Sequence, residues 1–127
     1  MNKRVVITGM GVISPVGNSV NDFRDGIFSG KNGIDKITKF DTEGFRACLA
    51  AEVKDFDVSA YMDKNEARKL DKYTQYAIAS AMQAVSDSKI AESVSPERFG
   101  VYFGSGIGGF ETMITEHSKL LERGPQR

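Results

Sequence analysis

The chain has 127 residues, with 17 Lys and Arg against 17 Asp and Glu, so its formal net charge at pH 7 is +0. A balanced charge excludes a global field that would attract nucleic acid or an anionic membrane surface. No apolar stretch has the length of a membrane-spanning helix, and the N-terminus shows no cleavable apolar segment. We therefore expect a cytoplasmic protein with no nucleic-acid or membrane partner, one domain in size or part of a larger one.

The first predicted element is a strand. Residues 4–7 begin with Arg4 and continue as a Val/Ile run that leads to Gly9-x-Gly11, which is typical of a buried strand in a parallel sheet. The two glycines resemble a dinucleotide-binding turn, but such a turn must run straight into a helix that receives the pyrophosphate. Here Ser14-Pro15 imposes extended backbone instead, so neither a dinucleotide nor any other cofactor is predicted.

A helix follows, because Ser19 is a good N-cap and Asp22 stands three residues later, as in a capping box. Gly30 is a plausible stop for this helix. Residues 31–46 show no regular pattern, and residues 48–53 favour a second strand.

Residues 55–71 are rich in charge and predict turns with one short helix. The strongest helical pattern covers residues 72–88, where apolar and small residues recur at three- and four-residue spacing. A turn at 93–97 precedes a third strand at 99–103, and a last helix is predicted over 110–121. The order β-α-β-α-β-α predicts an α/β fold with parallel strands and right-handed crossovers, as at the front of a domain.

The most informative segment is the loop at residues 104–109, in which four of six residues are glycine and Ile107 is the one apolar side chain. Glycine permits positive φ and close backbone approach. Two interpretations stay open at this point. The loop is either a flexible carrier of one hydrophobic plug beside a binding site or a plain tight connection from strand to helix.

The single cysteine, Cys48, and the single histidine, His117, exclude an internal disulfide and a Cys/His zinc site. A catalytic pair, with Cys48 as nucleophile and His117 as base, remains possible by residue count. However, Cys48 lies in an apolar run without the glycine turn or helix N-terminus that would activate a thiol. We interpret Cys48 as a small buried residue and His117 as a solvated residue on a polar helix.

Taken in order, these motifs resemble the N-terminal part of the 3-oxoacyl-[acyl-carrier-protein] synthase II family, the elongating condensing enzymes of bacterial type II fatty acid synthesis. The matching segments are residues 5–11, 14–17, 40–42, 53–56, 68–71, 75–76 and 104–109. The resemblance implies a thiolase-like fold of layered α/β/α/β/α type. Residues 1–127 would be the N-terminal part of its first half, ending before the family's catalytic cysteine. It also implies acyl carrier protein as partner, a homodimer and no cofactor.

In this family an acyl chain is transferred to the catalytic cysteine and is then attacked by the carbanion that forms when malonyl carrier protein loses carbon dioxide. The resemblance places that cysteine, two histidines and a lysine beyond residue 127. Cys48 and His117 match none of them. No catalytic residue is therefore predicted here, and we expect the isolated chain to be inactive.

Two groups of site residues are implied by the resemblance. Ile107 matches an isoleucine at the bottom of the acyl pocket, near the dimer interface, with Gly108 and Phe110 beside it; Phe110 could equally be a core aromatic. Arg68 and Lys69 match basic residues that contact the acidic carrier protein, with Lys64 nearby on the same predicted helix face. A solvated charged turn is the alternative for this second group.

Two other functions remain open. One is a different thiolase-fold relative, such as a polyketide ketosynthase or chain-length factor. The other is a non-catalytic module that binds a carrier protein.

Overall fold

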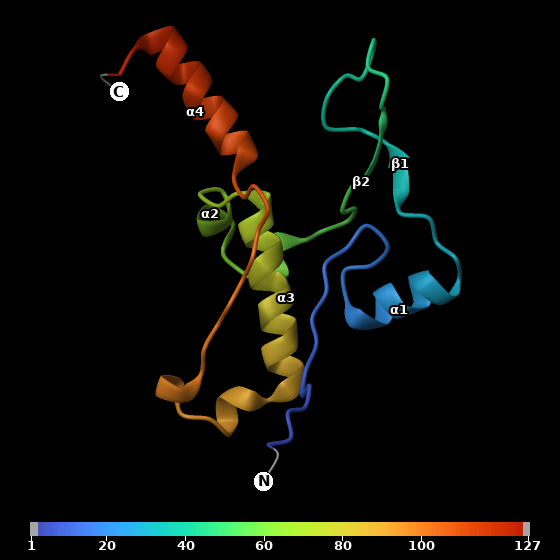
Figure 1. The fold of residues 1–127 in the computed structure, drawn as a ribbon, viewed down its shortest axis with the longest axis vertical. Helices are drawn as coiled ribbons and strands as arrows, with labels where there is room; N and C mark the ends of the chain where they lie inside the picture. Colours follow the sequence, from blue (N-terminus) through green and yellow to red (C-terminus); the bar gives the residue numbers. More distant parts are fainter. Residues whose placement is uncertain (1–2, 126–127) are drawn as a thin grey trace.

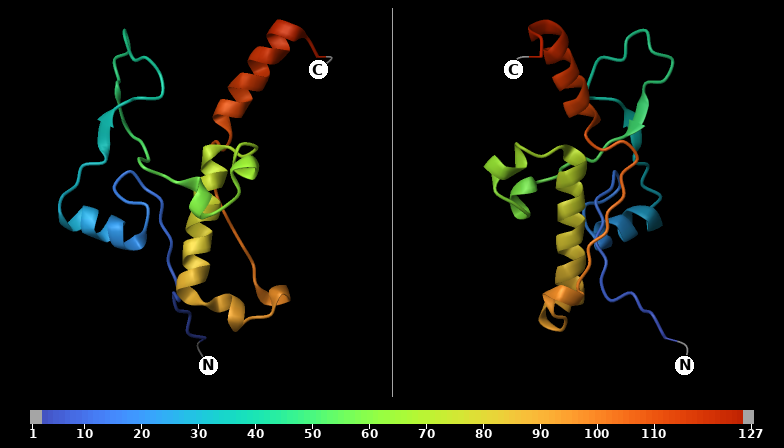
Figure 2. Two further views of the ribbon diagram at one scale, coloured as in Figure 1. Left: turned by 180° about the vertical axis from the view of Figure 1, so that it is seen from behind. Right: turned by 60° about the vertical axis from the view of Figure 1, so that its left-hand side comes forward.

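The computed structural model describes residues 3–125, and the long helix α3 (Lys72–Ser88) is the axis of their arrangement (Figure 1). The N-terminal segment and the segment before α4 both run alongside α3, while α1 and the two strands lie to one side of it (Figures 1 and 2). The other elements are α1 (Val20–Phe28), β1 (Ile34–Lys36), β2 (Leu49–Ala51), η1 (Val58–Ala60), α2 (Lys64–Ala67), η2 (Ile90–Glu92), η3 (Pro96–Arg98) and α4 (Phe110–Arg123).

The predicted helices are confirmed. Ser19 caps α1: its hydroxyl accepts from the Asp22 amide at 3.1 Å and donates to the Asp22 carboxylate at 2.7 Å. Gly30 follows that helix with φ +69°. α3 has the predicted bounds, and α4 begins at Phe110 as predicted but extends to Arg123. The region predicted to hold one short helix contains η1 as well as α2.

The first and third predicted strands are wrong for the described residues. The runs at 4–7 and 99–103 are extended segments without strand pairing, and Val5 and Tyr102 are 91% and 96% exposed. A strand forms only where a neighbour exchanges backbone hydrogen bonds with it. Within residues 3–125 neither run has such a neighbour, so the predicted parallel β-α-β-α-β-α sheet is not formed there.

The sheet among the described residues is instead a two-stranded antiparallel ribbon of β1 and β2, with Ile34 opposite Ala51 and Lys36 opposite Leu49. β1 lies in the region expected to be irregular, and β2 is shorter than the predicted strand at 48–53. The loop that joins the two strands contains no crossover helix, which is why they pair antiparallel.

The N-terminal segment packs its backbone directly on α3. A Cβ atom on Gly9 would overlap the Ala84 carbonyl oxygen and lie 2.7 Å from the Ser88 Cβ atom. A Cβ atom on Gly11 would overlap the Ser80 carbonyl oxygen. The three contacted residues are small and recur every four positions, so they form one face of the helix. These glycines therefore serve close packing of chain on helix, and not phosphate binding.

Polar side chains of α3 fix this segment in place. The Gln83 amide oxygen accepts from the Val12 amide at 3.0 Å, and its nitrogen donates to the Asn18 carbonyl and the Tyr61 hydroxyl, both at 2.8 Å. The Asp87 carboxylate accepts from the Met10 amide at 3.0 Å. One helix face thus binds the N-terminal segment and the region of η1 together.

Few apolar side chains are buried within residues 3–125. Ala67 and Ala79 are the buried hydrophobic residues of this region, at 4% and 0% exposure. Among the described helices, none combines the length and the apolar character that crossing a membrane requires.

We predict that Gly11→Ala disrupts the packing of the N-terminal segment on α3, because the added methyl group meets the helix backbone, which cannot rotate away. The expected loss is about 1–3 kcal/mol of unfolding free energy, measured by thermal or denaturant melting. Gly104→Ala is the matched control, because a Cβ atom there meets nothing within 4 Å. Equal stability of the two variants would contradict this account.

Candidate functional site

The glycine loop, residues 104–109, packs against other residues at its C-terminal end, whereas two of its earlier glycines have open space beside them. Cβ atoms built on Gly104 and Gly106 would meet nothing within 4 Å. Gly108 has φ +72°, and a Cβ atom there would lie 3.5 Å from the Tyr73 ring. The permissive backbone expected from the sequence is thus required at Gly108, where the loop turns against α3.

Ile107 is 70% exposed, and Phe110, the first residue of α4, is 54% exposed. A hollow of about 290 Å³ lies between the loop and α3. It is lined by Ile13, Tyr73, Tyr76, Ala77, Ser80, Phe103, Gly104 and Ser105. The first half of the loop therefore borders this hollow, whereas Ile107 and Phe110 do not. The structure does not gather Ile107, Gly108 and Phe110 around one cavity.

Tyr76 forms the aromatic wall of that hollow together with Tyr73 and Phe103. Its ring packs edge-on against Phe56 with 4.9 Å between ring centroids. Burial raises the pKa of the Tyr76 hydroxyl. The phenol therefore stays neutral in the neutral pH range, and the wall it forms carries no charge.

The end of the loop is held by a carboxylate. α4 begins after Gly109, which offers no side chain to cap the helix. Asp71, the residue before α3, lies at this position: its carboxylate accepts from the Thr112 hydroxyl at 2.5 Å. A Cβ atom on Gly109 would overlap one Asp71 carboxylate oxygen and lie 3.1 Å from its Cγ atom. A negative charge beside a helix N-terminus is favourable, and the space that it takes here requires glycine.

The predicted basic residues Lys64, Arg68 and Lys69 are all exposed. α2 ends at Ala67, and Arg68 is its C-cap with helical φ and ψ of −63° and −21°. Lys64 and Arg68 therefore share a helix face as predicted, whereas Lys69 lies on the turn that follows. Within residues 3–125 none of the three basic side chains forms an ion pair. We call residues 64–69 the basic turn.

A buried side chain supports the basic turn from behind. Gln75 is 5% exposed, and its amide nitrogen donates to the carbonyls of Ala67 and Leu70 at 2.8 and 2.9 Å. These two carbonyls flank Arg68 and Lys69, so their backbone is fixed on α3. Residues 75–76 carry part of the family resemblance, but no structural role was predicted for Gln75. The signal for such a role is its position one helical turn before Ala79, on the buried face of α3.

Cys48 and His117 are not brought together. Cys48 is half-buried and directly precedes β2, while His117 is exposed on α4, and these two elements lie apart (Figure 1). The interpretation of His117 as a solvated residue is confirmed. Within residues 3–125 no group of three or more acidic, Cys or His side chains could hold a metal ion.

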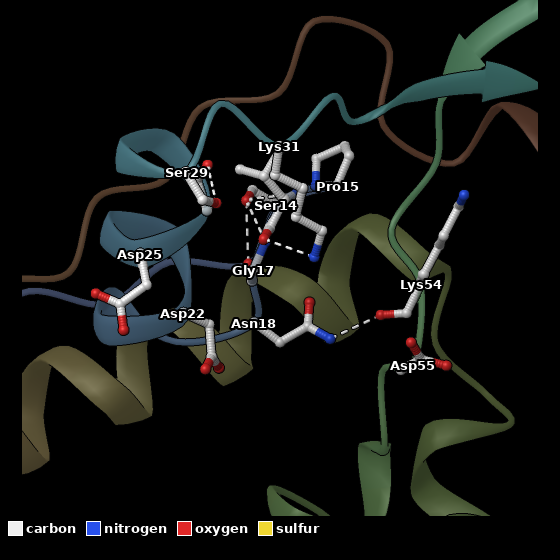
Figure 3. A pocket seen from close by; sticks show the side chains of 12 residues that line it. Ser14, Pro15, Gly17, Asn18, Asp22, Asp25, Ser29, Lys31, Lys54 and Asp55 are labelled. Carbon is white, nitrogen blue, oxygen red and sulfur yellow. Dashed lines mark hydrogen bonds between the residues drawn. The ribbon is translucent and has the colours of Figure 1, made fainter.

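A larger hollow, of about 630 Å³, lies beside the turn at residues 14–18 (Figure 3). The Ser14 hydroxyl makes its hydrogen bonds within this turn. It donates to the Gly17 carbonyl at 3.0 Å and accepts from the amides of Val16 and Gly17 at 3.3 and 3.2 Å. Asn18 donates to the Lys54 carbonyl at 2.8 Å. With its hydroxyl occupied in this way, Ser14 has a structural role.

Comparison with known proteins gives a family and a fold. A family model described as "Beta-ketoacyl synthase, N-terminal domain" matches residues 2–126. The chain is 49% identical to 3-oxoacyl-[acyl-carrier-protein] synthase 2 of Staphylococcus aureus (strain COL), over 99% of the chain and 31% of that protein. It is 38% identical to the protein of the same name from Synechocystis sp., over 98% of the chain and 30% of that protein. The chain thus spans about a third of the length of these relatives.

Solved structures of ketosynthases resemble the described residues. The ishigamide ketosynthase/chain length factor matches with a TM-score of 0.74 and 31% identity, over 94% of this chain and 30% of that one. A β-ketoacyl synthase from Burkholderia phymatum matches with a TM-score of 0.75 and 30% identity, over 98% and 31%. A complex of a type II polyketide acyl-carrier protein with its ketosynthase, AntDE:AntF, matches with a TM-score of 0.75 and 28% identity, over 98% and 33%. These matches confirm the predicted thiolase-like fold class.

Proposed function

Because this chain belongs to the β-ketoacyl synthase family, whose N-terminal domain it matches, we propose that it is part of a condensing enzyme of bacterial type II fatty acid synthesis. The enzyme would elongate an acyl chain held on carrier protein by decarboxylative Claisen condensation with malonyl carrier protein. The observation that carries this proposal is the 49% identity, along 99% of the chain, to a 3-oxoacyl-[acyl-carrier-protein] synthase 2. A polyketide ketosynthase is the second candidate, and the AntDE:AntF and ishigamide likenesses favour it at 28% and 31% identity.

The chemistry needs an activated thiolate and hydrogen-bond donors that stabilise the developing negative charge. In this proposal those groups come from the remainder of the enzyme, since Cys48 and His117 lie on separate elements. The present chain supplies part of the acyl pocket and part of the carrier-protein surface. Acyl transfer by a thiolate requires no cofactor, and none is proposed.

Ile107 would line the bottom of the acyl pocket, with Gly108 and Phe110 beside it. The support is an exposed apolar side chain on a loop in which Cβ positions at Gly104 and Gly106 meet no atom within 4 Å. Such a loop can move when a long acyl chain enters. The walls of the pocket would include parts of the enzyme outside these residues.

The basic turn would dock acyl carrier protein, in its acyl and malonyl forms. Lys64, Arg68 and Lys69 are exposed, and within residues 3–125 they make no ion pairs that a partner would have to break. Gln75 keeps their backbone in one arrangement, which reduces the ordering cost of binding. The complete enzyme would work as a homodimer in the cytoplasm.

The first test of this function compares the complete enzyme with the isolated 127-residue chain. Incubated with acyl and malonyl carrier protein, the complete enzyme should form the 3-oxoacyl product, and the isolated chain should form none. Product would be quantified by mass spectrometry of the carrier-bound thioester. Turnover by the isolated chain that is lost on Cys48→Ala would contradict the assignment of catalysis to the remainder of the enzyme.

A second prediction concerns docking. Arg68→Glu combined with Lys69→Glu should raise KM for carrier-protein substrates by about tenfold in all, since each exposed charge pair contributes on the order of 1 kcal/mol or less. KM for a small thioester substrate should change much less. Lys36→Glu combined with Lys39→Glu, on and just after β1, is the control, because this pair makes the same change in net charge. An equal loss with both substrate types would mean that the two residues support the fold.

A third prediction concerns Ile107. If this side chain gates the acyl pocket, Ile107→Phe should lower kcat/KM for long acyl primers and spare short ones. Kinetics with primers of graded length, alongside a melting curve, would measure the effect. Were Ile107 only part of a structural turn, the larger side chain would lower all activities together, with a stability loss of about 1–3 kcal/mol from overpacking.

A further inference from the structure

The glycine loop is anchored at one end by a residue from a different element. We propose that Asp71 is a positioning residue: through Thr112 and Gly109 it fixes the C-terminal end of the loop and thereby sets how far Ile107 can move. The effect on acyl length rests on the function proposed above. The anchoring itself does not.

Asp71 is suited to this role because its own backbone is fixed. Its carbonyl accepts from the amides of Thr74 and Gln75 at 3.0 and 3.1 Å, so the residue is part of the first turn of α3. Its side chain makes no cap for α3 and is directed instead to the start of α4, where it accepts from Thr112. The N-terminal ends of α3 and α4 are thereby joined, although η2 and η3 lie between these two helices in the sequence.

The charge of Asp71 adds to the hydrogen bond. α4 has no side-chain cap of its own, and a carboxylate near its N-terminus interacts favourably with the exposed amide groups there. Glu111 in the first turn contributes charge in the same way, but no hydrogen bond joins it to another element within residues 3–125. Within residues 3–125 the Asp71–Thr112 bond is therefore the side-chain hydrogen bond that joins the start of α4 to the start of α3.

The anchor divides the loop into a fixed and a free part. Gly109 lies against the Asp71 carboxylate, and Gly108 turns with positive φ against Tyr73. Cβ positions on Gly104 and Gly106 meet no atom within 4 Å. Movement is thus confined to residues 104–107, with Gly108 as the pivot and Ile107 next to it. Loss of the Asp71–Thr112 bond would let the backbone at Gly108 shift. The Ile107 side chain could then move over a larger distance.

The test uses three variants of the complete enzyme. Thr112→Val removes the hydroxyl but keeps the shape of the side chain, and Thr112→Ser restores the donor. Thr115→Val is the matched control, because Thr115 lines the same hollow between α3 and α4 and makes no side-chain hydrogen bond within residues 3–125. Two readouts are measured for each variant: amide hydrogen exchange of the peptide covering residues 104–113, and the ratio of kcat/KM for long and short acyl primers.

We expect Thr112→Val to raise exchange in this peptide roughly fivefold, as for the loss of one partly exposed charged hydrogen bond. The long-to-short ratio should change by a similar factor, while Thr112→Ser and Thr115→Val remain near wild type. Unchanged exchange in Thr112→Val would overturn the anchor. Raised exchange with an unchanged ratio would overturn the link to acyl length. A wild-type enzyme that forms no 3-oxoacyl product would instead refute the proposed function, and the exchange data would still decide the anchor.

Discussion

The close contact between the backbone of residues 9–11 and α3 is the constraint on which the described arrangement depends. It requires glycine on the chain and small residues on the helix, because any Cβ atom at Gly9 or Gly11 would enter the helix backbone. The same proximity lets Gln83 and Asp87 reach backbone amides of the N-terminal segment. Packing and hydrogen bonding are therefore not independent here, since a change that separates the backbones removes both.

Two glutamines of α3 hold the segments that pack around this helix. Gln83 holds the N-terminal segment and Tyr61, and Gln75 holds the two carbonyls that flank the basic turn. Each amide is satisfied by several partners, as a side chain in such a position must be, because an unmet donor or acceptor away from water is costly. The backbone of the exposed basic turn thus depends on hydrogen bonds from Gln75, a side chain that is itself buried.

The sequence predicted those features that local signals determine. The cap at Ser19 and the spacing of small and apolar residues along α3 define helices without reference to the rest of the chain. Strand formation at 4–7 and 99–103 could not be predicted in the same way, because a strand depends on a partner elsewhere in the chain and not on its own residues alone. The contact of Gly9 and Gly11 with α3 is indicated in the sequence by small helix residues at positions 80, 84 and 88. No local pattern indicates the Asp71–Thr112 bond, since 41 residues separate its partners.

The unpaired apolar segments have a practical consequence for work with this chain by itself. Val5, Ile7 and Tyr102 are 91%, 85% and 96% exposed, on runs that pair with no strand within residues 3–125. Such edges readily take up a strand from another molecule, which is the first step of intermolecular β-aggregation. Recombinant production of the 127 residues alone will therefore favour inclusion bodies.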